Sequence, residues 1–277
     1  MRAYIELTKP RITWLILMST GIGYWFGLQP GWGWWKLVHT LVGTGLLASG
    51  TAVLNQWMER DTDARMRRTQ GRPLPTGRVS PGRALIFGAL VAIAGFLELW
   101  VAVNHLAAML GWLTLASYLL LYTPLKRISP ICTTVGAFPG AMPPLIGFAA
   151  AAGTLTSQAW VLYAILFLWQ FPHFLSIAYI YREDYARGGI AMLPDGEEMA
   201  RQILYSSLLL IPVSLVPGLL ATSGRIYLAA ALVLGLVYFG AAARAARQRT
   251  TARARQLLLA SVAYLPLLYM FMLLDSR

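Results

Sequence analysis

Charged residues and cysteine are scarce in this sequence. Only 12% of its 277 residues are charged, whereas 57% are hydrophobic, and the mean hydropathy is +0.58. Soluble domains carry about 25% charged residues, so the composition excludes water as the main solvent of this chain. The single cysteine, Cys132, excludes an intramolecular disulfide and disfavours a cysteine-based metal site. We expect it to pack as a small apolar residue.

Apolar segments long enough to cross a bilayer recur along the whole chain. A helix needs about 20 such residues to cross roughly 30 Å of hydrocarbon. We therefore predict an all-α membrane protein, a helical bundle of about nine transmembrane helices, in a single domain covering residues 1–277. The first segment has no small-residue cleavage site followed by a soluble domain, so it is interpreted as a span. The nine candidate spans are residues 12–29, 36–57, 83–103, 105–123, 132–151, 157–180, 200–221, 225–243 and 256–274.

The basic residues are distributed asymmetrically. The net charge of +12 could suggest a nucleic-acid partner, but all Lys and Arg except Lys36, Arg225 and Arg277 lie in alternate connections between the spans. This alternation follows the positive-inside rule. It predicts a multi-pass protein of the cytoplasmic membrane with its N-terminus in the cytoplasm and, with nine spans, its C-terminus outside. The basic loops are expected to contact anionic headgroups of the lipid bilayer, and no nucleic acid is expected.

Eight of the eleven acidic residues fall in two of these basic connections. A secondary transporter for an anionic solute is one alternative, but its binding charges should lie near the bilayer midplane. Only Glu98 lies within a predicted span, near its outer end. The pattern therefore favours a site at one membrane face. The eight clustered acids are Glu59, Asp61, Asp63, Glu183, Asp184, Asp195, Glu197 and Glu198.

The first cluster has the spacing of a metal–phosphate site. Asn55, Glu59 and Asp63 recur every four residues, so on a helix they drift about 40° per step and share an arc of roughly 80°. Mg²⁺ prefers such oxygen donors and usually bridges carboxylates to substrate phosphates, while guanidinium groups bind phosphate oxygens in pairs. The alternative is a solvated loop whose acids and arginines pair with each other. The arginines that follow are Arg65, Arg67, Arg68 and Arg72.

A second informative segment runs from residue 169 to residue 194. On a continuous helix, Gln170, His173, Ile177, Tyr181 and Asp184 lie within about 100° and form a mostly polar stripe. Polar groups inside a membrane are costly and usually face the bundle interior or a water-filled cavity. The stripe therefore predicts a second part of the site.

Pro172 and His173 leave two interpretations open. Pro172 should bend the helix because it lacks an N–H and crowds the carbonyl four residues earlier. His173 is then either a functional group or a structural residue that hydrogen-bonds a carbonyl freed by the kink. The other histidines, His39 and His105, lie near the outer ends of spans and are assigned no chemistry.

Two further connections carry cations that suit a phosphate. Lys126 and Arg127 follow the fourth span in a short loop that should approach the bundle interior, whereas Lys9 and Arg11 are better explained as positive-inside anchors. The fifth span, residues 132–151, contains three glycines and three prolines. Small residues permit close helix packing, and prolines interrupt the backbone where it can line a cavity.

Taken together, these motifs resemble a known family. N-x-x-x-E-x-x-x-D followed by RT-x-x-RPLP, the YTPLKR loop, GA-x-PG-A-x-PPLIG, and above all WQ-x-PHF with YREDYARGGI-x-ML are similar to the protoheme IX farnesyltransferases (heme O synthases). These form the heme-modifying branch of the UbiA-type intramembrane prenyltransferases. Quinone-directed relatives usually carry Asp where Gln56 and Glu59 stand here. The pattern departs from the family at Gly188 and Ala191, where Ala and Pro are expected.

The resemblance implies a reaction and a set of roles. Farnesyl diphosphate would bind through Mg²⁺ and ionise, the 2-vinyl group of protoheme IX (heme b, a substrate) would attack the allylic cation, and water would complete heme O. His173, Gln170 and Tyr181 would bind the heme. The resemblance implies Asn55, Glu59, Asp63 and Asp184 as catalytic metal ligands, Arg67, Arg72, Lys126 and Arg127 as diphosphate ligands, and Trp57, Trp169, Phe171 and Tyr181 as aromatic groups near the cation.

Other functions remain open from the residues alone. A prenyltransferase acting on an aromatic quinone precursor shares the first acidic motif. A non-catalytic heme-binding membrane protein would explain His173 but not the two acidic loops. The resemblance also implies partners of the heme A synthase or terminal oxidase assembly kind, with the active site facing the cytoplasm.

Overall fold

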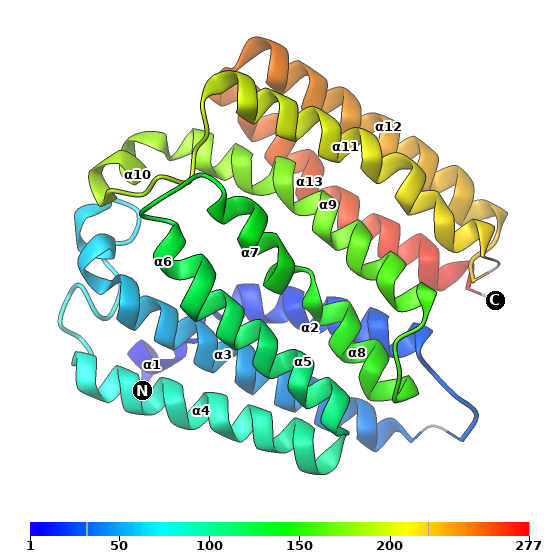
Figure 1. Cartoon of the computed structure of the whole chain (residues 1–277), viewed down its shortest axis with the longest axis horizontal. Helices are drawn as coiled ribbons and strands as arrows, with labels where there is room; N and C mark the ends of the chain where they lie inside the picture. The colour runs from blue at the N-terminus through cyan, green and yellow to red at the C-terminus, as the bar shows by residue number, and fades with distance from the viewer. Residues whose placement is uncertain (32, 221, 277) are drawn as a thin grey trace. The chain divides into compact units, whose positions relative to one another are not determined.

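The protein is described by a computed structural model covering residues 1–31, 33–220 and 222–276 (Figure 1). Within these ranges it consists of helices and their connections, without a β-strand, so the all-α prediction is confirmed. The chain divides into two compact units, which are described separately below. Unit 1 comprises Met1–Ala159 and Glu183–Ala191, and unit 2 comprises Trp160–Arg182 and Met192–Arg277. The single domain over residues 1–277 stays a prediction.

Unit 1 is built from helices, which pair backbone N–H and C=O groups within each segment and so suit an apolar surrounding without water. Asn104 caps one of them by accepting a hydrogen bond from the Ala107 N–H at 2.8 Å. Its amide also donates to the Ala149 carbonyl at 2.8 Å, which joins two helix ends. The elements are α1 (Arg2–Leu7), α2 (Pro10–Phe26), α3 (Trp34–Arg65), α4 (Pro81–Ala102), α5 (His105–Ala116), the π-helix η1 (Ser117–Tyr122), α6 (Thr123–Leu125), α7 (Cys132–Gly140), α8 (Met142–Ala152) and α10 (Arg182–Gly188).

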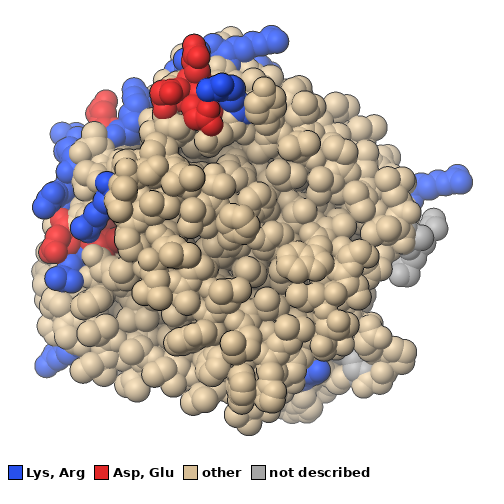
Figure 2. All heavy atoms as spheres, viewed as in Figure 1, with Lys and Arg blue, Asp and Glu red and all other residues tan. Residues whose placement is uncertain are grey.

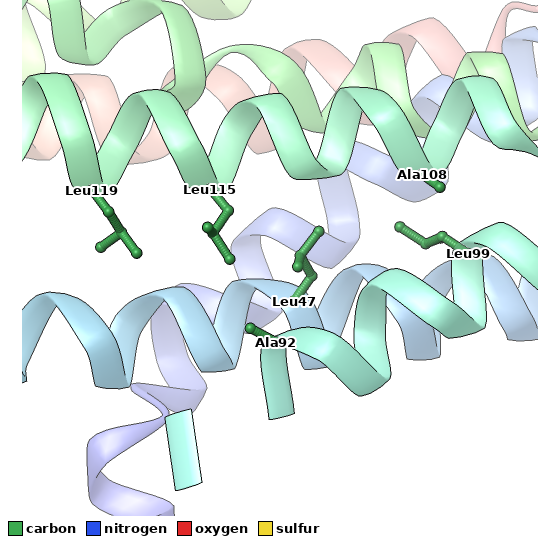
Figure 3. Packing of buried hydrophobic residues seen from close by; sticks show 6 residues of the cluster. All are labelled: Leu47, Ala92, Leu99, Ala108, Leu115 and Leu119. Atoms are coloured by element: carbon green, nitrogen blue, oxygen red, sulfur yellow. The ribbon is translucent and has the colours of Figure 1, made fainter. Parts of the chain in front are cut away.

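An apolar cluster joins α3, α4, α5 and η1 in the interior of unit 1 (Figure 3). Its leucines point toward one another from facing helices, while two alanines let the helices approach. Cys132 is also fully buried, as the sequence predicts. The cluster consists of Leu47, Ala92, Leu99, Ala108, Leu115 and Leu119.

Helices α2 and α8 pack backbone against backbone. A Cβ atom added at Gly147 would lie 1.8 Å from the Thr20 carbonyl oxygen, and one at Gly23 would lie 2.0 Å from that of Pro144. Only glycine fits at such contacts. The prediction that small residues of the fifth span permit close packing is confirmed at Gly147.

Two predicted spans change their helical geometry along their length. The fifth is split at Ala141 into α7 and α8, with Pro139 inside α7 and Pro143 in the first turn of α8. The fourth changes from an α-helix to the π-helix η1 at Ser117 and resumes as α6 beside Pro124. Such π segments are rare and frequently occur at functional sites.

The described residues of unit 2 form four long helices. Asp195 caps α11 by accepting hydrogen bonds from the Glu197 and Glu198 N–H groups, and Thr250 caps α13. Buried tyrosines link the helices: the Tyr227 hydroxyl donates to the Ser214 carbonyl at 2.6 Å, and the Tyr238 ring stacks on that of Tyr264. The helices are α9 (Ser157–Ile180), α11 (Gly196–Leu219), α12 (Arg225–Gln248) and α13 (Thr251–Leu274).

Eight helical segments of the described ranges are long and apolar enough to cross a membrane. They correspond to eight of the nine predicted spans. The remaining one corresponds to α2, whose 17 residues extend only about 25 Å. Most of the face in Figure 2 consists of uncharged side chains, with Lys, Arg, Asp and Glu gathered at its edge. The protein is therefore a multi-pass membrane protein.

Candidate active site

Three oxygen-bearing side chains lie buried in the last turns of α3. The helix runs without a break to Arg65, so the four-residue spacing places Asn55, Glu59 and Asp63 on one side, as predicted. Their exposed fractions are 1%, 9% and 1%. Polar groups buried this deeply usually have hydrogen-bond or charge partners.

Each of the two carboxylates is paired with a cation from another segment. Glu59 Oε1 lies 2.8 Å from Lys126 Nζ, and both side chains are 11% exposed. Asp63 Oδ2 lies 2.7 Å from Arg72 Nη1, with Asp63 again buried. Acids and cations therefore do pair with each other, but the alternative of a solvated loop is wrong for these residues.

Asn55 is held through its amide nitrogen. Its Nδ2 atom donates to Thr123 Oγ1 at 3.1 Å, and the Thr123 hydroxyl donates to the Tyr118 carbonyl within the π-helix at 2.8 Å. The amide oxygen of Asn55 is not used in this contact. The arrangement keeps that oxygen available on the same helix as Glu59 and Asp63.

The π-helix also shapes the surroundings of Lys126. Its ammonium lies 4.5 Å from the centre of the Tyr122 ring and 5.9 Å from that of Tyr118, within cation–π range. Burial alone lowers the pKa of Lys126, but Tyr122 and Glu59 outweigh burial and raise it well above the usual lysine value. This shift favours the charged form of Lys126. Neighbouring Arg127 donates to Thr62 Oγ1 at 2.6 Å.

Asp184 joins this site from α10. Its two carboxylate oxygens accept hydrogen bonds from the backbone N–H groups of Arg67 and Arg68, each at 3.1 Å, and it also pairs with Arg187. Burial alone raises the pKa of Asp184, but the bonds from Arg187, Arg68 and Arg67 outweigh burial and hold it below the ordinary value. The Arg67 side chain is exposed, so it is the backbone of this predicted diphosphate ligand that contacts Asp184.

Lys9 belongs to this site, although its sequence pattern predicts a membrane anchor. It has a left-handed backbone, with φ of 49°, between α1 and α2. Burial, followed by the nearby charges of Arg72 and Lys126, lowers its pKa to about 7, while Glu59 and Asp63 act in the opposite direction. Lys9 is therefore near all four of these groups, and no sequence signal distinguishes this position from an anchoring cation.

Gln56 explains how Lys9 is placed. Gln56 is 2% exposed. Its side-chain amide nitrogen donates to the Leu7 carbonyl at 2.7 Å and to the Ala52 carbonyl at 3.2 Å. The end of α1 is thereby tied to α3, two residues before Lys9. Arg78 adds a paired contact to Glu6 from the loop after α3.

The three predicted heme-binding residues belong to unit 2. Gln170 is buried and donates to the Leu166 carbonyl of its own helix at 3.0 Å. His173 Nδ1 lies 2.8 Å from Ser261 Oγ of α13, so the partner of this nitrogen is a side-chain hydroxyl and not a carbonyl freed by the kink. The continuous stripe is also wrong beyond Ile180, because α9 ends there and α10 starts at Arg182. Tyr181 lies between these helices and is exposed.

Oxygen and cationic groups thus converge at one end of unit 1. Within the described part of the chain, no three His, Cys, Asp or Glu side chains are grouped closely enough to hold a metal by themselves. Metal ligation by Asn55, Glu59, Asp63 and Asp184 stays a prediction. The site places two buried carboxylates beside several cations. This arrangement suits an anion that binds together with a divalent ion.

Comparison with other sequences shows close relatives. The chain is 62% identical to a protoheme IX farnesyltransferase of Solibacter usitatus (strain Ellin6076) over 99% of each chain. It is 49% identical to a protoheme IX farnesyltransferase of Koribacter versatilis (strain Ellin345), over 99% of this chain and 93% of the relative.

Solved structures share the fold at low sequence identity. A digeranylgeranylglyceryl phosphate synthase superposes with a TM-score of 0.83 at 17% identity, covering 99% of this chain and 97% of that one. A UbiA homolog from Archaeoglobus fulgidus bound to GPP and Mg²⁺ gives 0.68 at 14% identity, covering 98% and 99%. The UbiA prenyltransferase family also matches residues 16–273. The chain therefore belongs to the UbiA prenyltransferase family, and it is a prenyltransferase.

Proposed function

We propose that this protein transfers a farnesyl group from farnesyl diphosphate to the 2-vinyl group of protoheme IX, with addition of water, to give heme O and diphosphate. The proposal is supported by relatives named protoheme IX farnesyltransferase that match the whole chain at up to 62% identity. The observation that carries it is the pairing of Glu59 with Lys126 and of Asp63 with Arg72 at a buried site.

The paired charges suit a metal diphosphate. A diphosphate competes with Glu59 and Asp63 for the cations, and its phosphate oxygens accept from the ammonium and guanidinium groups that those acids bind in this structure. Lys126 and Arg72 therefore change partners when substrate binds. Arg127, which follows Lys126, and Lys9, near both pairs, add positive charge around the departing group.

The carboxylate oxygens of Glu59 and Asp63, once Lys126 and Arg72 bind the diphosphate, can bind a divalent ion. Asn55 Oδ1, Glu59 and Asp63 are hard oxygen donors, the type that Mg²⁺ prefers, and the UbiA homolog from Archaeoglobus fulgidus binds Mg²⁺ with GPP. Asp184 is the fourth proposed ligand, since a carboxylate keeps acceptor sites beyond the two used by backbone N–H groups. When bound, Mg²⁺ stabilises negative charge on the leaving diphosphate.

The residues of this chain favour ionisation by binding that charge where it develops. The bond between C1 of the farnesyl group and oxygen breaks, and its electron pair leaves with the diphosphate, held by Arg72, Lys126 and Arg127. The terminal carbon of the 2-vinyl group bonds to C1. Water then adds to the inner vinyl carbon and releases a proton, which completes a hydroxyethylfarnesyl side chain.

The heme acceptor is assigned to His173, Gln170 and Tyr181, on and just after α9. Tyr181 lies outside the helix that carries the other two. The positive-inside distribution supports a cytoplasmic membrane location with the diphosphate site facing the cytoplasm. Heme A synthase or terminal oxidase assembly proteins are the proposed partners.

Purified protein in nanodiscs tests the reaction directly. Heme b, farnesyl diphosphate and Mg²⁺ should yield a product whose mass equals heme b plus farnesyl plus hydroxyl, and H₂¹⁸O should label it. Asp63→Asn serves as the variant with impaired turnover, and Glu197→Gln, which alters an exposed acid on α11 in unit 2, serves as the matched control.

The acceptor is tested in the same assay with 4-hydroxybenzoate, an aromatic quinone precursor, in place of heme b. Prenylation of that compound without prenylation of heme b would overturn the heme assignment while retaining the prenyltransferase. Product without ¹⁸O would overturn only the water addition.

A further inference from the structure

The hydrogen bonds around Ser261 determine which nitrogen of His173 carries a proton. Ser261 is fully buried in α13, and its hydroxyl donates to the Leu258 carbonyl at 2.6 Å. A hydroxyl has only one proton, so the Ser261 oxygen serves as an acceptor for its other partner. That partner is His173 Nδ1 at 2.8 Å, which must therefore carry the hydrogen.

The neutral imidazole is thereby restricted to one tautomer. With the proton on Nδ1, the Nε2 atom has a bare lone pair. Within the described residues, Nε2 of His173 has no hydrogen-bond partner. The ring belongs to a partly buried residue in unit 2, so this lone pair is both unused and positioned by its neighbours.

The orientation of the ring is set by the same two helices. Trp169 stacks on His173, with ring centres 4.6 Å apart and planes 23° from parallel. The Trp169 indole also donates to the backbone carbonyl of Ser261 at 2.8 Å, and Tyr238 donates to the Trp169 carbonyl at 3.1 Å. Residue 261 is therefore connected to α9 through both its side chain and its backbone.

This tautomer distinguishes between two ways of binding a heme. An imidazole can ligate the heme iron through a bare nitrogen, or it can donate a hydrogen bond to a propionate. A bare Nε2 can only do the first. We propose that Ser261 is a positioning residue that holds His173 in the Nδ1–H tautomer, so that Nε2 ligates the iron of the heme acceptor.

The inference deepens the proposed function and rests on heme being the acceptor. A partner that fixes the tautomer of a metal-ligating histidine typically affects metal affinity by about 10- to 100-fold. We therefore expect Ser261→Ala to weaken ferric heme b binding within that range. Its matched control is Ser207→Ala, a buried serine of α11 in unit 2 whose hydroxyl bonds only to its own helix.

Two porphyrins separate iron ligation from propionate contact. Ferric heme b and metal-free protoporphyrin IX share their propionates, but only heme b has iron. Ser261→Ala should weaken heme b binding and change its ferric electron paramagnetic resonance spectrum, while leaving metal-free protoporphyrin binding unchanged. His173→Ala should abolish the imidazole signature, and Ser207→Ala should match the parent protein.

The opposing outcomes are distinct. Equal weakening of both porphyrins, or an unchanged heme spectrum in Ser261→Ala, would overturn iron ligation through a Ser261-held tautomer even if heme O is still formed. If the parent protein neither binds heme b nor converts it, while still binding farnesyl diphosphate, the proposed function fails first.

Discussion

The substitution Asp184→Asn tests whether the second acidic loop holds the 66–72 segment in place or only binds metal. The two oxygens of Asp184 accept from the backbone N–H groups of Arg67 and Arg68, both at 3.1 Å. In Asp184→Asn, one oxygen becomes an NH₂ group, so one backbone N–H loses its acceptor and faces a donor. The 66–72 segment, which includes Arg72, should then open more easily even without metal.

The structure sets the size of this effect. A hydrogen bond to a charged group contributes about 1.5–3 kcal/mol, whereas the pair with Arg187 adds little because that side chain is 37% exposed. We expect the local opening free energy of residues 66–72 to fall by about 2–3 kcal/mol. At about 1.4 kcal/mol per tenfold, amide exchange there should accelerate by about 30- to 150-fold.

Hydrogen exchange read by mass spectrometry, in chelator, measures this opening. Glu183→Gln is the matched control because Glu183 is the exposed neighbouring acid. The lowered pKa of Asp184 means that its contribution is present above the ordinary aspartate pKa and is lost as pH falls through the lower native value. If amide exchange of residues 66–72 is unchanged in Asp184→Asn but Mg²⁺-dependent turnover is lost, the anchoring role is refuted. Asp184 would then be a metal ligand alone.

Three further outcomes are expected. Lys126→Met should raise the farnesyl diphosphate KM by about 10- to 100-fold, whereas Arg247→Gln, in the exposed last turn of α12, should leave steady-state kinetics unchanged. Glu59→Gln and Asp63→Asn should each lower kcat by roughly 10²-fold, and excess chelator should abolish turnover. Full activity of both variants, or full activity of the parent protein in chelator, would contradict the metal–diphosphate assignment. Because the pKa of Lys9 is about 7, anionic substrate should bind with proton uptake, so calorimetric affinity should fall by up to about tenfold per pH unit above 7, and Lys9→Arg should remove that slope. By the same linkage the unfolded chain binds more protons above pH 7, so the penalty of burying this group decreases, and the folded state gains stability, as pH rises toward the ordinary lysine value.

Local rules predicted the parts of the site that lie on one helix. The positions of Asn55, Glu59 and Asp63 depend only on helical periodicity and on α3 continuing past the apolar stretch, which it does to Arg65. The helix assignments were predictable for a similar reason, since backbone groups in a bilayer must be satisfied within each segment. Resemblance then added the reaction type, which periodicity alone does not specify.

Contacts between distant segments were not predictable in this way. Lys9 follows the pattern of an anchoring cation, and contacts of α1 with distant segments, such as the bond from Gln56 to the Leu7 carbonyl, place it near the acids. The stripe from Gln170 to Asp184 assumed one continuous helix, but the chain turns at Tyr181. The role of Ser261 depends on a contact to a residue 88 positions away, for which a lone serine in an apolar helix carries no signal.

The paired charges explain why composition could not separate a self-paired loop from a diphosphate site. A buried carboxylate without a partner is strongly unfavourable, so a site that binds both a divalent ion and an anion must neutralise its own acids and cations when neither is bound. Glu59 with Lys126 and Asp63 with Arg72 do this. Each pair also matches a metal diphosphate, because its carboxylate can bind the metal and its cation can bind a phosphate oxygen. Self-pairing is therefore what such a site requires, and the burial of the pairs, which composition does not reveal, distinguishes it from a solvated loop.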